Sequence, residues 1–293
     1  MPRSHPPSLT TIVRRTLLEE CGPLRARTVL AAVSGGGDSQ AMLEVLARLA
    51  PKLGYELRAH GVDHGLRKEA SRELDLAEAL ARRLSVPFAR TCLAVERGGN
   101  LQARAREARY RALREVAAPH QALIATAHHA DDRAETVLLR LLRGSGPRGL
   151  AVLPARAQDV IRPLLRATKA DVLTHLDRHA LDFAQDPSNA DAAFLRVRVR
   201  GELMPVLSNL SPQIVRHLNA LADALAGAKL PDLGELEEWG PDPASHETGR
   251  DGAPALNRAQ IREVVRARKL GRPVTIRVSG ARDVLAKRPQ RNK

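Results

Sequence analysis

Residues 28–39 read TVLAAVSGGGDS, an apolar run followed by three consecutive glycines, an aspartate and a serine. The apolar run predicts a buried β-strand over 28–34, and the apolar spacing beyond the glycines predicts a helix over 39–50. Glycines adopt positive φ and let an anion approach the backbone, while a helix start adds aligned N–H groups. A tight turn without a ligand is the simpler interpretation, but the polar residues around the glycines favour a phosphate cradle. Its residues are Ser34, Gly35, Gly36, Gly37, Asp38 and Ser39.

Within this loop Asp38 has a different expected role from its neighbours. A carboxylate does not bind phosphate directly, but it can hold Mg²⁺ against it. The hydroxyl groups of Ser34 and Ser39 are expected to act as donors to the phosphate. The lysine-containing P-loop pattern is missing, because no lysine lies between Met1 and Pro51. The sequence therefore predicts a different phosphate loop, with Mg²⁺ on Asp38.

Apolar runs and amphipathic stretches alternate beyond this loop. Further strands are expected at 57–63, 86–95, 122–127 and 160–164, and helices at 68–84, 102–116, 132–142 and 169–178. This alternation predicts an α/β fold in which a doubly wound parallel sheet is covered by helices on both faces. Ligands bind beyond the carboxyl ends of such strands, where the segments 34–39, 63–67 and 127–135 are each rich in polar groups.

The composition points to a polyanionic partner. The 293 residues include 47 basic and 33 acidic ones, a net charge of +14, and 40 of the basic residues are arginine. Nucleic acid is the first candidate, with an arginine-biased composition that serves no ligand as the alternative. Aromatic residues make up only 2% of the chain, so phosphate contacts rather than base stacking would dominate binding.

The same composition excludes several classes of protein. With 43% hydrophobic residues, the chain is not globally disordered, and its apolar runs are too short to cross a membrane. Two cysteines, Cys21 and Cys92, form neither a disulfide framework nor a paired metal-ligand spacing. The first 15 residues lack the apolar core of an export signal, so we expect a cytoplasmic protein.

Asp132 and Glu135 form an acid pair that follows the fourth expected strand. They lie three residues apart on one helix face, so both carboxylates can converge on one cation. The alternative is a pair of acids that complements the dipole at the helix start. His128 and His129 precede them without a third suitably spaced ligand, so no zinc site is predicted.

Arginines in two other segments, and one histidine in a third, are candidates for contact with a nucleotide. Arg106 and Arg109 lie three apart on a basic helix, where they could steady an α-phosphate as charge develops on it; a solvated helix face is the alternative. Arg143 precedes a Gly-Ser-Gly loop suited to phosphate contact or closure over the site. His64 follows a strand, where it could lie against an adenine or donate to a phosphate, although a structural histidine is the usual case.

Together these segments resemble a known family. The pattern Ser-Gly-Gly-x-Asp-Ser after a first strand resembles the loop of the PP-loop ATP pyrophosphatases, which cleave ATP between the α and β phosphates and adenylate a substrate oxygen. Five more segments occur in the order found in the tRNA(Ile)-lysidine synthetase family. They are VDHGLR (62–67), AREARY (105–110), AHHADDRAET (127–136), RGSG (143–146) and DPSN (186–189) with the arginines of 196–200.

This resemblance implies an adenine nucleotide alpha hydrolase-like fold and a carbon–nitrogen ligase. Such an enzyme uses ATP to join free L-lysine to carbon 2 of the wobble cytidine of the CAU-anticodon isoleucine tRNA. It passes through an adenylated cytidine and releases AMP and pyrophosphate.

The resemblance also assigns roles to residues. ATP is expected at residues 34–39 and at His64, with Asp38, Arg106 and Arg109 as catalytic groups. Lysine is expected at Asp132, Glu135 and Arg196, and tRNA at Arg143, Arg198 and Arg200. The chain departs from the family at Val197, where asparagine is usual, and at Arg133, where glutamine is common.

Three regions are expected along the chain: an N-terminal extension with a first helix (1–25), the PP-loop ATP pyrophosphatase domain (26–200), and a smaller, mainly helical accessory domain (201–293). Toward the C-terminus we expect helices at 193–207, 213–226 and 261–268, an acidic linker at 231–252, a hairpin of 273–278 with 281–286, and a basic tail. The resemblance implies that this accessory domain can support a homodimer.

Two other functions fit part of the pattern. A PP-loop tRNA 2-thiolation enzyme shares the loop and the RNA, but it typically needs paired cysteines for sulfur transfer. A non-catalytic RNA-binding protein explains the charge but neither the glycine-rich loop nor the acid pair.

Overall fold

The parallel sheet predicted from the alternating pattern is present, and it places the glycine-rich loop at the centre of its carboxyl edge. The computed structural model describes residues 7–63, 69–93, 101–184 and 195–228, together with the short strands at 275–276 and 284–285. Six strands form the main sheet, in the order β3-β2-β1-β4-β6-β5. They are β1 (Thr28–Val33), β2 (Glu56–Asp63), β3 (Phe88–Cys92), β4 (Leu123–Ala125), β5 (Arg156–Ala157) and β6 (Val160–Ile161).

All neighbouring strands of this sheet are parallel except the edge pair β5 and β6. The chain adds β2 and then β3 on one side of β1, and it returns to the other side with β4. The strand order therefore reverses between β1 and β4, and in doubly wound sheets ligands bind in the crevice at that point.

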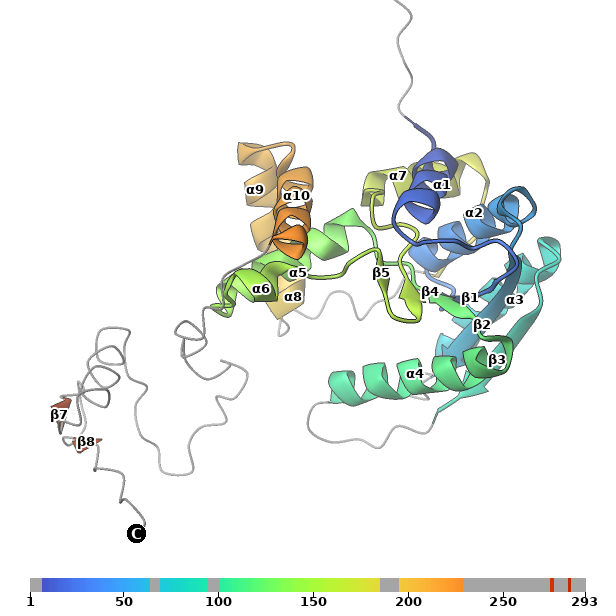
Figure 1. Cartoon of the computed structure of the whole chain (residues 1–293), viewed down its shortest axis with the longest axis horizontal. Helices are drawn as coiled ribbons and strands as arrows, with labels where there is room; N and C mark the ends of the chain where they lie inside the picture. The colour runs from blue at the N-terminus through green and yellow to red at the C-terminus, as the bar shows by residue number, and fades with distance from the viewer. Residues whose placement is uncertain are drawn as a thin grey trace, which may run out of the picture. The chain divides into compact units, whose positions relative to one another are not determined.

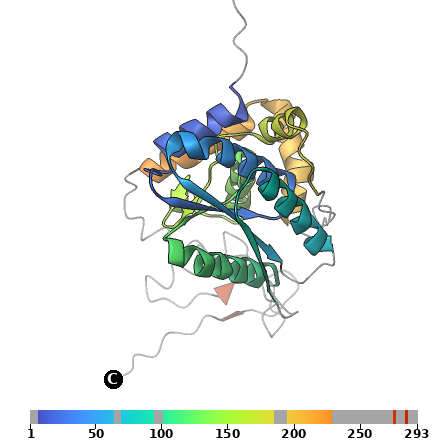
Figure 2. The ribbon, with the colours of Figure 1, turned by 90° about the vertical axis from the view of Figure 1, so that its right-hand side faces the viewer.

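Helices cover both faces of the sheet (Figures 1 and 2). The helices of the first 184 residues are α1 (Leu9–Glu19), α2 (Gly37–Leu53), α3 (Glu69–Arg83), α4 (Leu101–Ala117), α5 (Ala130–Leu142), α6 (Pro147–Leu150) and α7 (Lys169–Arg178), with a 3₁₀ turn at Ala118–His120. Beyond them come α8 (Leu195–Arg198), a π-helical turn (Val199–Leu203), α9 (Met204–Leu210) and α10 (Ile214–Gly227).

The central strand β1 is buried on both faces, as a parallel strand between helix layers must be. Val29, Ala31 and Val33 join the core beneath α1, α2, α3 and α7. The alternate residues Leu30 and Ala32 join a second core that contains Leu113 and Ala117 of α4. The sequence pattern of 28–33 is continuously apolar for this reason.

A third apolar cluster joins α5 to the helices that follow residue 195. It contains Val137 and Leu138 of α5, Met204 of α9, and Leu218 and Ala222 of α10. The back face of α5 is thus covered by α10, while its N-terminal turn remains at the carboxyl edge of the sheet.

Several elements differ from the sequence predictions. The strand expected over 160–164 ends at Ile161 because Pro163, which has no N–H group, follows closely. The two-residue strand β5 was not predicted, and the helix expected over 193–207 is interrupted by the π-helical turn.

The chain divides into two compact units, Met1–Glu238 and Trp239–Lys293. In the second unit the structure describes β7 (Thr275–Ile276) and β8 (Val284–Leu285), which pair antiparallel within the two segments expected to form a hairpin. The predicted helix at 261–268, acidic linker and basic tail lie outside the described residues, and the three domain boundaries stay predictions. Across the described ranges, no helix is both long and apolar enough to span a bilayer.

Candidate active site

The glycine-rich loop turns sharply from β1 into α2. Gly35 has φ +80°, and a Cβ atom there would lie 1.9 Å from the backbone oxygen of Glu73 on α3. Only glycine fits this position, because any side chain would overlap that backbone. Gly36 forms the N-cap of α2, whose first turn begins at Gly37.

Ser39 fixes the shape of this loop from inside. It is 5% exposed, its hydroxyl donates to the carbonyl oxygen of Gly36 (2.8 Å), and it accepts from the backbone N–H of Ser34 (3.2 Å). The Ser34 and Ser39 hydroxyl oxygens lie 3.4 Å apart. The loop is therefore held in shape by its own hydrogen bonds, and its predicted ATP contacts stay predictions.

Three helices begin at the carboxyl edge of the sheet beside Asp38. Asp38 lies in the first turn of α2, His129 is the N-cap of α5, and Lys169 is the first residue of α7. The Lys169 ammonium lies 2.6 Å from Asp38 Oδ1, and His129 Nε2 lies 3.7 Å from Asp38 Oδ2. Each helix start carries a partial positive charge, so the three together favour an anion at this point.

Two hydrogen bonds donated by backbone N–H groups connect the start of α5 to the start of α7 and the residues before it. The N–H of Lys169 donates to Asp131 Oδ2 (2.8 Å), and the N–H of Ala130 donates to the carbonyl oxygen of Ala167 (2.8 Å). His129 is 4% exposed; burial disfavours its charged form, but Asp131, Asp132 and Asp38 outweigh burial and raise its pKa. The result is a rigid, charged junction between the phosphate loop and the acid pair.

The acid pair on α5 faces two arginines. Arg196 binds Asp132 (3.0 Å) and Glu135 (3.1 Å), and Arg200 binds Asp132 (3.3 Å) and Glu135 (2.6 Å). The Glu135 side chain is only 4% exposed, whereas both arginine side chains are more than 40% exposed. Burial raises the pKa of Asp132, but the charges of His129 and Arg196 lower it further than burial raises it. Glu135 is thus buried and Asp132 half-buried beneath two cations that solvent can reach.

Helical geometry explains which arginines meet the acids. Arg196 and Arg200 are four residues apart, so they share a face of the helical segment that starts at Leu195. Arg198 points elsewhere and pairs with Glu202 (3.0 Å). Two arginines that the resemblance assigned to different ligands, one to lysine and one to tRNA, therefore lie at the same pair of carboxylates.

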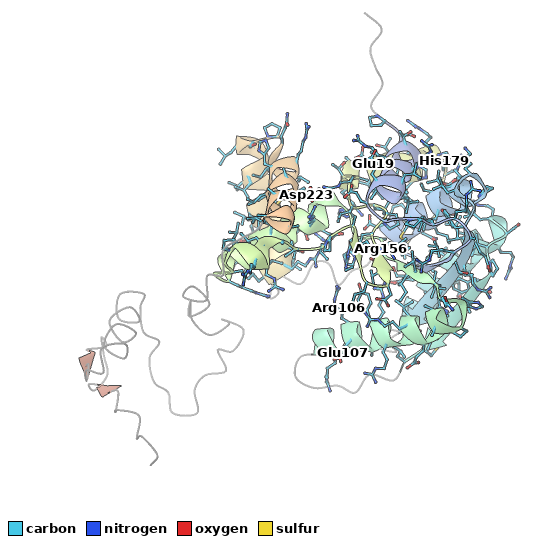
Figure 3. All side chains as sticks on the ribbon, in the orientation of Figure 1. Glu19, Arg106, Glu107, Arg156, His179 and Asp223 are labelled. Atoms are coloured by element: carbon cyan, nitrogen blue, oxygen red, sulfur yellow. The ribbon has the colours of Figure 1, made fainter. Side chains whose placement is uncertain are left out.

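A second group of arginines surrounds His128, which follows the end of β4. Burial, together with the charges of Arg106, Arg162 and Arg109, lowers the pKa of His128 to about 3, although Asp132 opposes this. The Thr126 hydroxyl and His128 Nδ1 share a hydrogen bond of 3.0 Å. Arg106, which Figure 3 labels on α4, also lies over the Tyr110 ring at 5.1 Å. The charges of the two predicted catalytic arginines thus act on His128 and favour its neutral form.

Arg162, at the end of β6, was not singled out from the sequence. Its side chain is buried, one guanidinium nitrogen donates to the carbonyl oxygen of Pro154 (2.7 Å), and its Nε has no hydrogen-bond partner among the described residues. Arg162 adds a third positive charge to the group around His128.

Besides Arg198, one predicted site residue lies away from this cluster. Arg143 is exposed at the C-terminal end of α5, about 16 Å along the helix axis from Asp132. His64 lies outside the described residues, as does the DPSN segment at 186–189.

A partly buried ionic network holds α10 against the back of α5. Arg133 is 1% exposed, and its guanidinium donates to Asp223 of α10 (2.6 Å) and to the carbonyl oxygen of Val152 (2.9 Å). Asp223, labelled in Figure 3, also accepts from Arg166 (2.5 Å), which in turn binds Glu20 (2.6 Å). Arg133, at a position where the family commonly has glutamine, therefore forms an ion pair that joins α5 to α10.

Asn219, one turn before Asp223 on α10, completes this contact. Its side-chain amide donates to the carbonyl oxygen of Ala130 (2.8 Å), in the first turn of α5. The position of the acid pair thus depends on α10.

The fold and the loop define a PP-loop ATP-binding protein, and the family model described as a PP-loop domain matches residues 9–207. Among curated proteins, the chain is 39% identical over 268 residues to a tRNA(Ile)-lysidine synthase of Thermobifida fusca, covering 90% of this chain and 81% of that protein. The chain belongs to the tRNA(Ile)-lysidine synthase family. It is also 39% identical to the Pseudomonas aeruginosa tRNA(Ile)-lysidine synthase, in a match that covers 74% of this chain but only 52% of that longer relative.

Among solved structures, the U34-tRNA thiolase NcsA from Methanococcus maripaludis with its [4Fe-4S] cluster shares the fold. The TM-score is 0.63 at 19% sequence identity, and the match covers 74% of this chain and 77% of the thiolase. At this identity the likeness concerns the fold alone.

Proposed function

We propose that this chain forms lysidine: it uses ATP to ligate free lysine to carbon 2 of the wobble cytidine in the CAU-anticodon isoleucine tRNA. One observation carries the proposal. The phosphate loop after β1 and the acid pair after β4 meet at the point where the strand order reverses, joined by the contacts among Asp38, His129 and Lys169. A nucleotide and an amine bound at these two places would lie side by side.

In the first step, the cytosine oxygen at carbon 2 attacks the α-phosphate of ATP, and pyrophosphate leaves. The loop N–H groups and the converging helix starts of α2, α5 and α7 bind the negative phosphates. Arg106 and Arg109, with no acid partner among the described residues, stabilise the charge that develops on the α-phosphate. The cytidine then carries AMP as a leaving group.

In the second step, the ε-amine of lysine attacks carbon 2 and displaces AMP. Asp132 and Glu135 hold an ammonium group of lysine, in exchange for part of their contacts with Arg196 and Arg200. An arginine released from these acids is free to bind a carboxylate or a tRNA phosphate. Arg143, Arg198 and the basic surface supply further tRNA contacts.

Mg²⁺ fits this site through Asp38. The ion commonly binds one or two carboxylates together with substrate phosphates and water, so it needs no larger cage of protein ligands. Asp38 is partly exposed beside the phosphate loop, and the described ranges contain no cluster of three acidic, histidine or cysteine ligands. When bound, Mg²⁺ would neutralise charge on the departing pyrophosphate.

The thiolation alternative is weaker for a chemical reason. The sequence has two cysteines; Cys21 is buried, with its pKa raised to about 11 by burial, and Cys92 is exposed on β3. A buried thiol with a raised pKa is a poor nucleophile. A binding protein without activity leaves the phosphate loop and the acid pair unexplained.

Transfer of radiolabelled lysine to a panel of tRNA transcripts tests the proposal. We expect incorporation only into the CAU-anticodon isoleucine transcript, and only with ATP and Mg²⁺. Sulfur incorporation would instead establish the thiolase, and tRNA binding without pyrophosphate release would establish the binding protein. Because the proposed substrate is tRNA, we place the protein in the cytoplasm; sedimentation equilibrium tests the homodimer expected from the resemblance.

A further inference from the structure

The phosphate loop brings no cation of its own. Residues 28–47 contain neither lysine nor arginine, and the charged residues in that stretch are Asp38 and Glu44. A triphosphate in the loop would therefore meet backbone N–H groups and a nearby carboxylate. Apart from a bound metal ion, a cation that neutralises its charge must come from elsewhere in the chain.

The fold supplies such a cation from a residue 131 positions later. Lys169 is the first residue of α7, and its ammonium lies 2.6 Å from Asp38 Oδ1, in the first turn of α2. Among the described residues, Lys52 is the other lysine, and it lies exposed in the last turn of α2. Although the chain is rich in arginine, the basic groups that the structure places against Asp38 are thus Lys169 and His129.

The backbone of Lys169 is fixed while its side chain remains accessible. Its N–H donates to Asp131 (2.8 Å), and Thr168 and Asp171 form a capping box around the start of α7. The side chain is 42% exposed, and within the described residues its ammonium has Asp38 as its hydrogen-bond partner. An ammonium has three donors, so two remain for a ligand.

We propose that Lys169 is a catalytic residue that binds the β- and γ-phosphates of ATP and stabilises pyrophosphate as it leaves. This inference rests on the proposed function. In the free protein Lys169 neutralises Asp38; when ATP binds, the ammonium turns to the phosphate oxygens, and the Asp38 carboxylate becomes available to Mg²⁺. No covalent bond or proton transfer to Lys169 is involved. A compact charge on a flexible stem suits this exchange better than a planar guanidinium does.

The test compares ATP, AMP and pyrophosphate as ligands in calorimetric titrations of the full chain with Mg²⁺, without tRNA or lysine. We expect Lys169→Met to weaken ATP and pyrophosphate binding by about 10- to 100-fold, the effect of losing a charged hydrogen bond. AMP binding should change less than about twofold, because AMP lacks the β- and γ-phosphates. The control Lys52→Met should leave all three affinities unchanged, and Lys169→Arg should restore part of the loss.

A purely structural role, in which Lys169 only pins α7 to α2 through Asp38, gives a different result. In that case Asp38→Asn would already remove the pair, and adding Lys169→Met to it would not weaken pyrophosphate binding further. We expect the double variant to bind pyrophosphate about tenfold more weakly than Asp38→Asn alone. Equal affinities of these two variants, or equal losses for ATP and AMP in Lys169→Met, would overturn the inference.

Failure of this inference is distinguishable from failure of the proposed function. If the chain modifies tRNA in another way, the nucleotide titrations still report whether Lys169 binds phosphate. If lysidine forms but Lys169→Met binds pyrophosphate normally, the function stands and the role of Lys169 falls.

Discussion

Replacing Asp223 by asparagine should destabilise the protein by leaving Arg133 buried without a counter-charge. Loss of one partner from a fully buried ion pair costs about 3–5 kcal/mol. The Arg133 side chain is 2% exposed but that of Asp223 is 38% exposed, so solvent screening reduces the expected cost to about 2 kcal/mol. For a chain of this size, we expect Tm to fall by about 5 °C.

Glu20→Gln is the matched control, because Glu20 contacts Arg166, whose side chain is 32% exposed, whereas that of Arg133 is 2% exposed. We expect it to cost less than about 1 kcal/mol. Urea unfolding followed by circular dichroism compares the two variants. Equal destabilisation by Asp223→Asn and Glu20→Gln would refute the reasoning, because it would show that the burial of Arg133 does not set the cost.

Three further outcomes are expected. Asp38→Ala should abolish adenylation; ATP–pyrophosphate exchange measures this, and normal exchange would show the assignment to be wrong. Glu135→Gln should raise the KM for lysine by about tenfold with little change in ATP affinity, since one carboxylate of the pair loses its charge; steady-state kinetics with varied lysine check it. His128→Gln should make the protein more resistant to acid. The folded pKa of His128, about 3, lies below its unfolded value, so the wild type loses stability as pH falls below about 6.5, by about 2 kcal/mol at pH 5. Urea unfolding at pH 7 and pH 5 should show a smaller pH dependence in the variant.

Local sequence patterns were sufficient to predict the sheet and its loop. A strand buried on both faces has a continuous apolar run, and the glycines after it mark the turn into a helix. Residues 28–39 could therefore be predicted as a strand, a loop and the start of a helix. The two-residue strand β5 carries no such signal, because its pairing depends on the neighbouring β6. The edge of the sheet formed by β5 could therefore not be predicted from the sequence.

Contacts between distant segments limited the prediction of the site. Spacing placed Asp132 and Glu135 on one helix face, but it could not show that Arg196 and Arg200 lie across from them. Lys169 was predicted only as the start of a helix, although that helix follows the fifth parallel strand. Residues after that strand belong to the same carboxyl edge as the loop, and including them in the search would have identified Lys169.

If lysine binds the acid pair as proposed, it replaces an arginine over these carboxylates, so its recognition is an exchange of one cation for another. Replacing a guanidinium by an ammonium leaves the number of neutralised carboxylates unchanged, so added salt competes weakly with the amino acid. The tRNA, if it is held through its phosphates as proposed, would release counterions and lose affinity steeply as ionic strength rises. Raising the salt concentration should therefore weaken the binding of tRNA while the protein remains saturated with lysine.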